Sequence, residues 1–138
     1  MERSDSAAVA ASPDTIVLRV PPSARYARLV RMSAANVATI GGFAVDEVDD
    51  VRMAAEEAFV YACATGVAGE MSIEFSLTPG QLEMVFELGE ENVSEDESEP
   101  SLVYSALILD AMCDECHIND EGDAHMRLVK RIGSADVL

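Results

Sequence analysis

Three residues in the C-terminal third of the chain form its most specific chemical motif. Cys113, Cys116 and His117 match Cys-x-x-Cys-His, in which two thiols attach haem and the imidazole binds its iron. Haem attachment of this kind needs export, and residues 1–12 lack the apolar run of a signal peptide. A zinc site is another hypothesis, with a fourth ligand from distant Cys63 or His125. We expect neither, and interpret the two thiols as small apolar side chains.

A row of arginines is the second chemical feature. Arg25, Arg28 and Arg31 recur every three positions, so a helix places them on one face. A guanidinium pairs bidentately with carboxylates, which suits a protein interface. Two interpretations stay open at this point: a docking face for a partner protein, and an ordinary solvated surface.

The rest of the chain is strongly acidic. The net charge is −17, and no Lys or Arg occurs between Arg52 and Arg127. Residues 90–100 combine carboxylates with Ser and Asn and are predicted to form a mobile loop without the spacing of a calcium site. Such a field repels nucleic acid and anionic membranes, so direct binding to DNA is not expected.

The hydrophobic pattern predicts the elements that position these residues. We expect strands at 15–20, 72–78, 81–88, 115–119 and 124–132, and helices at 23–40, 46–64 and 102–112. The predicted fold is α+β, a two-layer α/β sandwich with a mixed, mostly antiparallel sheet and helices on one face. The low aromatic content predicts a core mainly of Ala, Val, Leu, Ile and Met. One domain at 14–133 is expected between a disordered tail at 1–13 and a short tail at 134–138.

Three segments resemble a known family. They are SARYARLVR at 23–31, VDEVDDVRMAAEEAFVYA at 45–62 and LILDAMCDECHI at 107–118. Their order and element lengths are similar to those of the GHKL, or histidine-kinase-like, ATPase fold over about residues 15–132. More narrowly, they resemble the anti-sigma-factor serine kinases of bacterial partner-switching systems. The resemblance also places Arg28 where the family carries an arginine that docks a sigma factor or an anti-anti-sigma protein.

The resemblance assigns two positions in the helix at 46–64. Glu57 is similar to the family's general base, although a solvated or partner-facing carboxylate is the favoured interpretation here. Tyr61 stands where the family has an Asn that holds Mg²⁺ against the ATP phosphates. A phenol lacks the amide carbonyl that a hard cation prefers, so we expect Tyr61 to fill volume instead.

The adenine-recognition motif of the family is altered as well. Its Asp corresponds to Glu87, with Leu88 and Gly89 following, or to Leu88 if the inward phase of the strand continues. Both registers stay open, and neither supplies an Asp.

The glycine-rich phosphate motif is altered in the same way. Val103 and Ser105 stand where family members carry glycine, so close approach of the backbone to phosphate is lost. These five positions, together with Tyr61, are the degenerate nucleotide-site positions of the chain.

The hypothesis that follows is a pseudokinase-like, non-catalytic regulator of transcription. It would bind a sigma factor or an anti-anti-sigma partner in the cytoplasm, form a homodimer as the resemblance implies, and need no cofactor, metal, nucleic acid or membrane. The alternative is an active serine kinase of the same family, with ATP and Mg²⁺ and with Glu57 as base.

Overall fold

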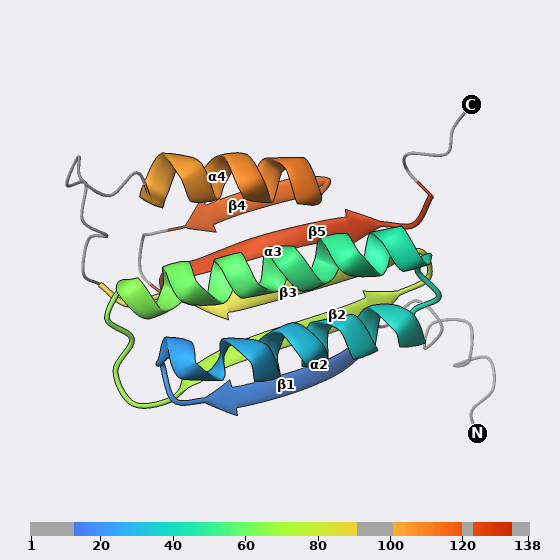
Figure 1. Cartoon of the computed structure of the whole chain (residues 1–138). Coiled ribbons are helices and arrows are strands. Elements are labelled where there is room, and N and C mark those ends of the chain that lie inside the picture. Colours follow the sequence, from blue (N-terminus) through green and yellow to red (C-terminus); the bar gives the residue numbers. More distant parts are fainter. Residues whose placement is uncertain (1–12, 91–100, 120–122, 134–138) are drawn as a thin grey trace, which may run out of the picture.

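The computed structural model describes residues 13–90, 101–119 and 123–133, and within them the chain folds into two layers (Figure 1). Its elements are β1 (Asp14–Val20), the 3₁₀ turn η1 (Ala24–Tyr26), α2 (Ala27–Ile40), α3 (Val45–Ala64), β2 (Met71–Thr78), β3 (Gln81–Glu87), α4 (Ser101–Met112), β4 (Glu115–Asn119) and β5 (His125–Arg131). The two expected tails, apart from Pro13, and most of the acidic loop lie outside the described residues.

The strands form one sheet in the order β1-β2-β3-β5-β4, and the three helices lie side by side on one of its faces (Figure 1). This confirms the predicted α+β sandwich. The sheet was expected to be mixed and mostly antiparallel, and all of its described pairings are antiparallel. The reason is that α2 and α3 run in opposite directions, so the chain enters β2 from the end at which β1 finished.

The hairpin between β2 and β3 follows the sequence prediction. Pro79 and Gly80 form its turn, and Thr78 pairs with Gln81. Gly80 has a φ of 78°, the left-handed conformation that the third position of a type II turn requires. This turn fixes the register of β3, and therefore decides which of its side chains face the helices.

The helix boundaries differ slightly from the predicted ones. Ser23 accepts a backbone hydrogen bond from Arg25 and caps the short η1 turn, so the predicted helix at 23–40 is a 3₁₀ turn that continues into α2. At the start of α3, the Glu47 carboxylate accepts a hydrogen bond from the Ala44 N–H at 2.8 Å. These contacts satisfy backbone donors that have no partner inside a helix.

Small residues dominate the centre of the helical layer. Ala54, Ala55, Ala58 and Ala62 are fully buried along α3, which lets α2 and α4 pack closely on either side. The aliphatic core was predicted, but three of its largest buried side chains are aromatic: Phe59, Phe75 and Phe86. Low aromatic content therefore did not keep aromatic residues out of the core.

Candidate functional site

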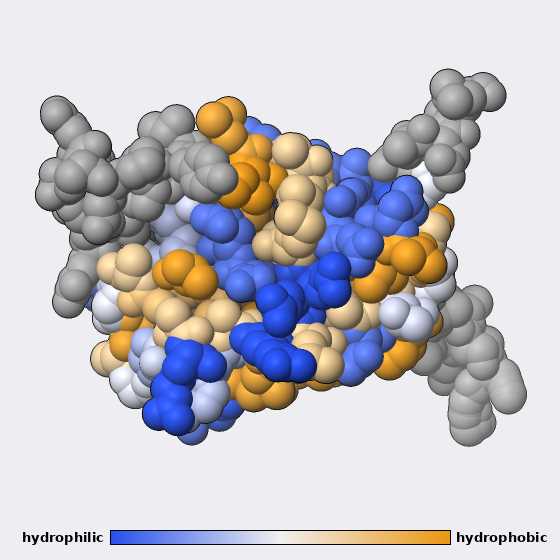
Figure 2. All heavy atoms as spheres, viewed as in Figure 1, coloured by the Kyte–Doolittle hydropathy of each residue, from blue (hydrophilic) through white to orange (hydrophobic). Residues whose placement is uncertain are grey.

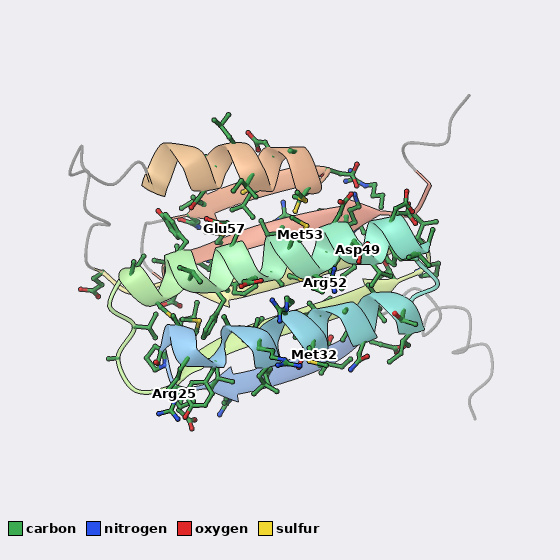
Figure 3. All side chains as sticks on the ribbon, viewed as in Figure 1. Arg25, Met32, Asp49, Arg52, Met53 and Glu57 are labelled. Carbon is green, nitrogen blue, oxygen red and sulfur yellow. The ribbon has the colours of Figure 1, made fainter. Side chains whose placement is uncertain are left out.

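Glu57 and Tyr61 lie one turn apart on α3, on the side that faces α4. Both side chains are half-buried. Their spacing of four residues places them on one face of the helix, as the sequence predicted. Figure 3 shows Glu57 pointing into the space between α3 and α4.

The Glu57 carboxylate is held by a residue of α4. The Ser105 hydroxyl donates a short hydrogen bond to Oε2 of Glu57, and Ser105 is 6% exposed. The contact gives the buried Ser105 hydroxyl a hydrogen-bond partner. It also joins two positions that the resemblance assigns to different motifs: Glu57 to the general base and Ser105 to the glycine-rich phosphate motif. Sequence analysis identified both positions separately but did not predict their contact.

Val103 and Ser105 both lie inside α4, which begins at Ser101. The Val103 side chain is outside the described part of the structure. At Ser105 the helix is already established, so its backbone N–H belongs to the hydrogen-bond ladder of α4 and is not free for a ligand.

The structure places Leu88 on the helical side of the sheet and Glu87 on the solvent side. Leu88 is 9% exposed and continues the buried series Leu82, Met84 and Phe86. The exposed Glu87 carboxylate accepts a hydrogen bond from the Ser72 N–H at 3.0 Å. Of the two registers left open by the sequence, the structure has the one that turns Leu88 inward.

Gly89 packs directly against the end of α3. A Cβ atom at Gly89 would lie 2.2 Å from the Thr65 carbonyl oxygen, which no side chain can do without backbone movement. The Gly89 N–H donates to the Thr65 hydroxyl at 2.7 Å, and that hydroxyl donates to the Ala62 carbonyl at 2.6 Å. Glycine at this position therefore has a packing role. Thr65 itself was missed, because nothing in the sequence links it to Gly89.

Two cations of β5 are engaged in ion pairs with other residues. On β5, Arg127 pairs with Glu83 at 2.9 Å and Lys130 with Asp50 at 3.2 Å. Because no Lys or Arg lies between Arg52 and Arg127, the half-buried surroundings of Glu57 and Tyr61 gain no positive charge from α4, β2 or β3.

The three arginines of the N-terminal helical segment have different environments. Arg31 forms an ion pair with Glu56 of α3 at 3.0 Å. The Arg25 guanidinium lies 5.4 Å from the centre of the Tyr26 ring (labelled Arg25 in Figure 3). Arg28 is exposed and has no ion pair or hydrogen bond to any described side chain. The shared face was predicted, but only Arg28 presents an unengaged guanidinium there.

The Cys-x-x-Cys-His residues lie where α4 ends and β4 begins. Cys113 and Cys116 are free thiols that pack against the core, and burial raises the pKa of Cys113 to about 12. His117 is exposed and contacts the Glu115 carboxylate at 3.0 Å. Within residues 13–90, 101–119 and 123–133, no group of three or more His, Cys, Asp or Glu side chains is arranged to hold a metal ion. Over the same residues, no helix is both long and apolar enough to cross a membrane.

The chain is similar to named serine kinases. It is 32% identical over 75 residues to serine-protein kinase RsbW of Bacillus thuringiensis (strain Al Hakam), of Bacillus cereus (strain AH187) and of Bacillus anthracis. The matched stretch is 52% of this chain and 47% of each relative, so the chain spans about half the length of the curated relatives it matches. No protein-family profile matches it. The likeness supports the serine-kinase resemblance and does not separate an active kinase from a degenerate regulator.

Proposed function

We propose that the chain is a non-catalytic regulator of the anti-sigma type, which binds a sigma factor or an anti-anti-sigma protein. The observation that carries this proposal is the hydrogen bond from Ser105 to Glu57. A general base must accept a proton from its substrate within hydrogen-bond reach. Here one oxygen of the carboxylate already accepts a hydrogen bond from a hydroxyl of the protein itself.

The chemistry of the neighbouring positions supports the same proposal. Mg²⁺ prefers carboxylate, amide and water oxygens, and Tyr61 offers a phenol in their place. Leu88 presents a buried apolar side chain where the adenine amino group would need an acceptor. Phosphoryl transfer depends on cations that neutralise the phosphates, and Lys and Arg are absent from Met53 to Met126. These residues do not fit a Mg²⁺–ATP complex.

The partner would dock on α2. Arg28 has no ion pair or hydrogen bond to a described side chain there, and Leu29 and Met32 are 48% and 49% exposed on the same helix. Arginine is enriched among the residues that contribute most to binding energy at protein interfaces. We place this regulator in the cytoplasm and expect it to act as a homodimer.

Purified sigma factors and anti-anti-sigma proteins, each tested by surface plasmon resonance, provide the test of partner binding. We expect at least one to bind, and Arg28→Ala to weaken that complex by about tenfold or more, or about 1.4 kcal/mol. Arg19→Ala is the matched control, because Arg19 is an exposed arginine on β1, beside Ser72 and Glu74 on the sheet. Equal losses in the two variants would contradict docking on α2.

An active serine kinase is the second candidate function. The relatives are serine-protein kinases by name, which favours this alternative, and Glu57 stands at the position of the base. If this alternative holds, the chain phosphorylates a serine of its partner with ATP and Mg²⁺, and Glu57→Gln abolishes the reaction. If our proposal holds, no phosphate reaches the partner from the wild-type chain.

A further inference from the structure

A cavity of about 440 Å³ lies between α4 and the edge strand β4. Its walls come from α3, α4, β4 and β5, and they consist of Tyr61, Ser105, Ala106, Leu107, Leu109, Cys116, Ile118 and Met126. The volume falls within the range of about 300–1,000 Å³ that is usual for small-molecule sites. Figure 2 shows hydrophobic residues in the region of α4.

The wall offers almost no polar contact to a ligand. Most of its side chains are aliphatic or carry sulfur, and the Ser105 hydroxyl is already engaged by Glu57. An occupant that needs several hydrogen bonds would lose them on leaving water, and each unsatisfied polar group would weaken its binding. The cavity therefore selects apolar molecules.

The charge around the cavity favours uncharged ligands over anionic ones. Among the described residues no lysine or arginine lines the cavity, and two carboxylates act on its lining residues: Glu57 of α3 accepts a hydrogen bond from Ser105, and Asp110 of α4 lies near Cys116. A phosphate, sulfonate or fatty-acid carboxylate would enter against this field without a cation to pair with. An uncharged molecule has no such penalty.

The entrance is open to solvent. Leu107 of α4 is 63% exposed and Ile118 of β4 is 46% exposed, on either side of the cavity. A ligand can therefore enter without unfolding α4, and it gains by covering these two side chains. Each Å² of apolar surface removed from water contributes about 25 cal/mol.

We propose that this cavity is a binding site for an uncharged, apolar small molecule. The site is distinct from the docking face on α2, and its occupancy does not depend on whether the chain binds a sigma factor. A partner protein's side chain is the competing occupant, but it would require a surface of about 800 Å² on this chain around the cavity. That surface would include the exposed carboxylates of Asp110 and Asp114, next to the cavity. A partner would have to cover both charged groups.

The neutral fluorophore N-phenyl-1-naphthylamine is a suitable probe, since its emission rises in apolar surroundings. We expect saturable binding of one probe per chain. Ile118→Lys places a charge at the entrance and should weaken binding about tenfold or more. Ile16→Lys is the matched control, because Ile16 is 41% exposed on β1, the opposite edge strand of the same sheet. Ala106→Phe, which fills the cavity without adding charge, should weaken binding as well.

Thiol protection locates the probe independently. Cys116 lines the cavity and Cys63 does not, so the probe should slow alkylation of Cys116 by N-ethylmaleimide and leave Cys63 unchanged. No saturable binding, equal losses in Ile118→Lys and Ile16→Lys, or no protection of Cys116 would each overturn the proposal. If the cavity accepts only the side chain of a partner protein, the probe shows no saturable binding.

Discussion

At the scale of single residues, two positions that the resemblance assigns to a nucleotide site have structural partners of their own. Gly89 and Glu57 keep the residue types expected from the resemblance, but each has a structural partner. Gly89 approaches Thr65 too closely for any side chain, and Glu57 accepts the hydroxyl proton of Ser105. Packing alone is sufficient to preserve both residues.

The Thr65 hydroxyl provides the first prediction. Thr65→Val removes the only described acceptor of the Gly89 N–H, and a buried donor without a partner costs about 1–3 kcal/mol. We expect that loss in the free energy of unfolding, measured by urea denaturation. Thr39→Val is the control, because its hydroxyl also donates to a carbonyl of its own helix, at 2.9 Å, but is exposed. A comparable loss in both variants would contradict a specific role for Thr65.

Cys113 provides a second prediction at this scale. Burial, with a smaller contribution from Cys116, raises the pKa of Cys113 to about 12, and only the thiolate is alkylated readily. Near pH 8, we expect Cys113 to react with iodoacetamide about tenfold or more slowly than an unfolded thiol. Peptide mass spectrometry in buffer and in urea measures this difference. Equal rates of Cys113 in the two solvents would show that the thiol is accessible.

The sequence indicated the orientation of one site residue, Leu88, but not the contact between two others, Ser105 and Glu57. The alternation of Leu82, Met84 and Phe86 allowed the inward register of Leu88 to be considered, because a strand has a period of two. The contact between Ser105 and Glu57 could not be anticipated. It joins residues 48 positions apart and depends on how α4 lies against α3, which no local pattern encodes.

At the scale of elements, α4 is tethered to its neighbours by Lys130. The Lys130 side chain, 12% exposed, donates to the Met112 carbonyl at the end of α4 and to Asp50 of α3. A cation at a helix C-terminus pairs with carbonyls that the helix leaves unsatisfied. One side chain of β5 thus joins both helices that enclose Glu57.

Lys130→Met should therefore loosen α4. We expect a loss of about 1–2 kcal/mol in the free energy of unfolding, and faster amide hydrogen exchange in residues 105–112 than in α2. Arg52→Met is the control, since Arg52 forms an exposed pair with Asp49 at 2.9 Å and should cost less than about 1 kcal/mol. Unchanged exchange in α4 of the Lys130 variant would contradict the tether.

The elements themselves were largely predictable from sequence. Pro79 and Gly80 marked the turn of the hairpin, and the apolar spacing of α2 and α3 marked their buried faces. The 3₁₀ turn before α2 was not predicted, because an N-terminal Ser caps either kind of helix. The mostly antiparallel character of the sheet was predicted, because the strands fall in hairpins.

At the scale of the whole molecule, charge is the dominant property. The net charge of −17 on 138 residues produces self-repulsion in the folded state, which salt screens. We expect the melting temperature to rise as NaCl is increased from about 10 mM to about 1 M, where the Debye length falls from about 30 Å to about 3 Å. Differential scanning calorimetry measures the change. A melting temperature that does not depend on ionic strength would contradict this expectation.

Binding of nucleotide tests the central claim most directly, and isothermal titration calorimetry with ATP and Mg²⁺ measures it. The serine-protein kinase RsbW of Bacillus cereus serves as the positive control. The account predicts no saturable heat from this chain at nucleotide concentrations up to about 1 mM. Saturable, Mg²⁺-dependent binding near 1 μM, a free energy of about −8 kcal/mol, would contradict it.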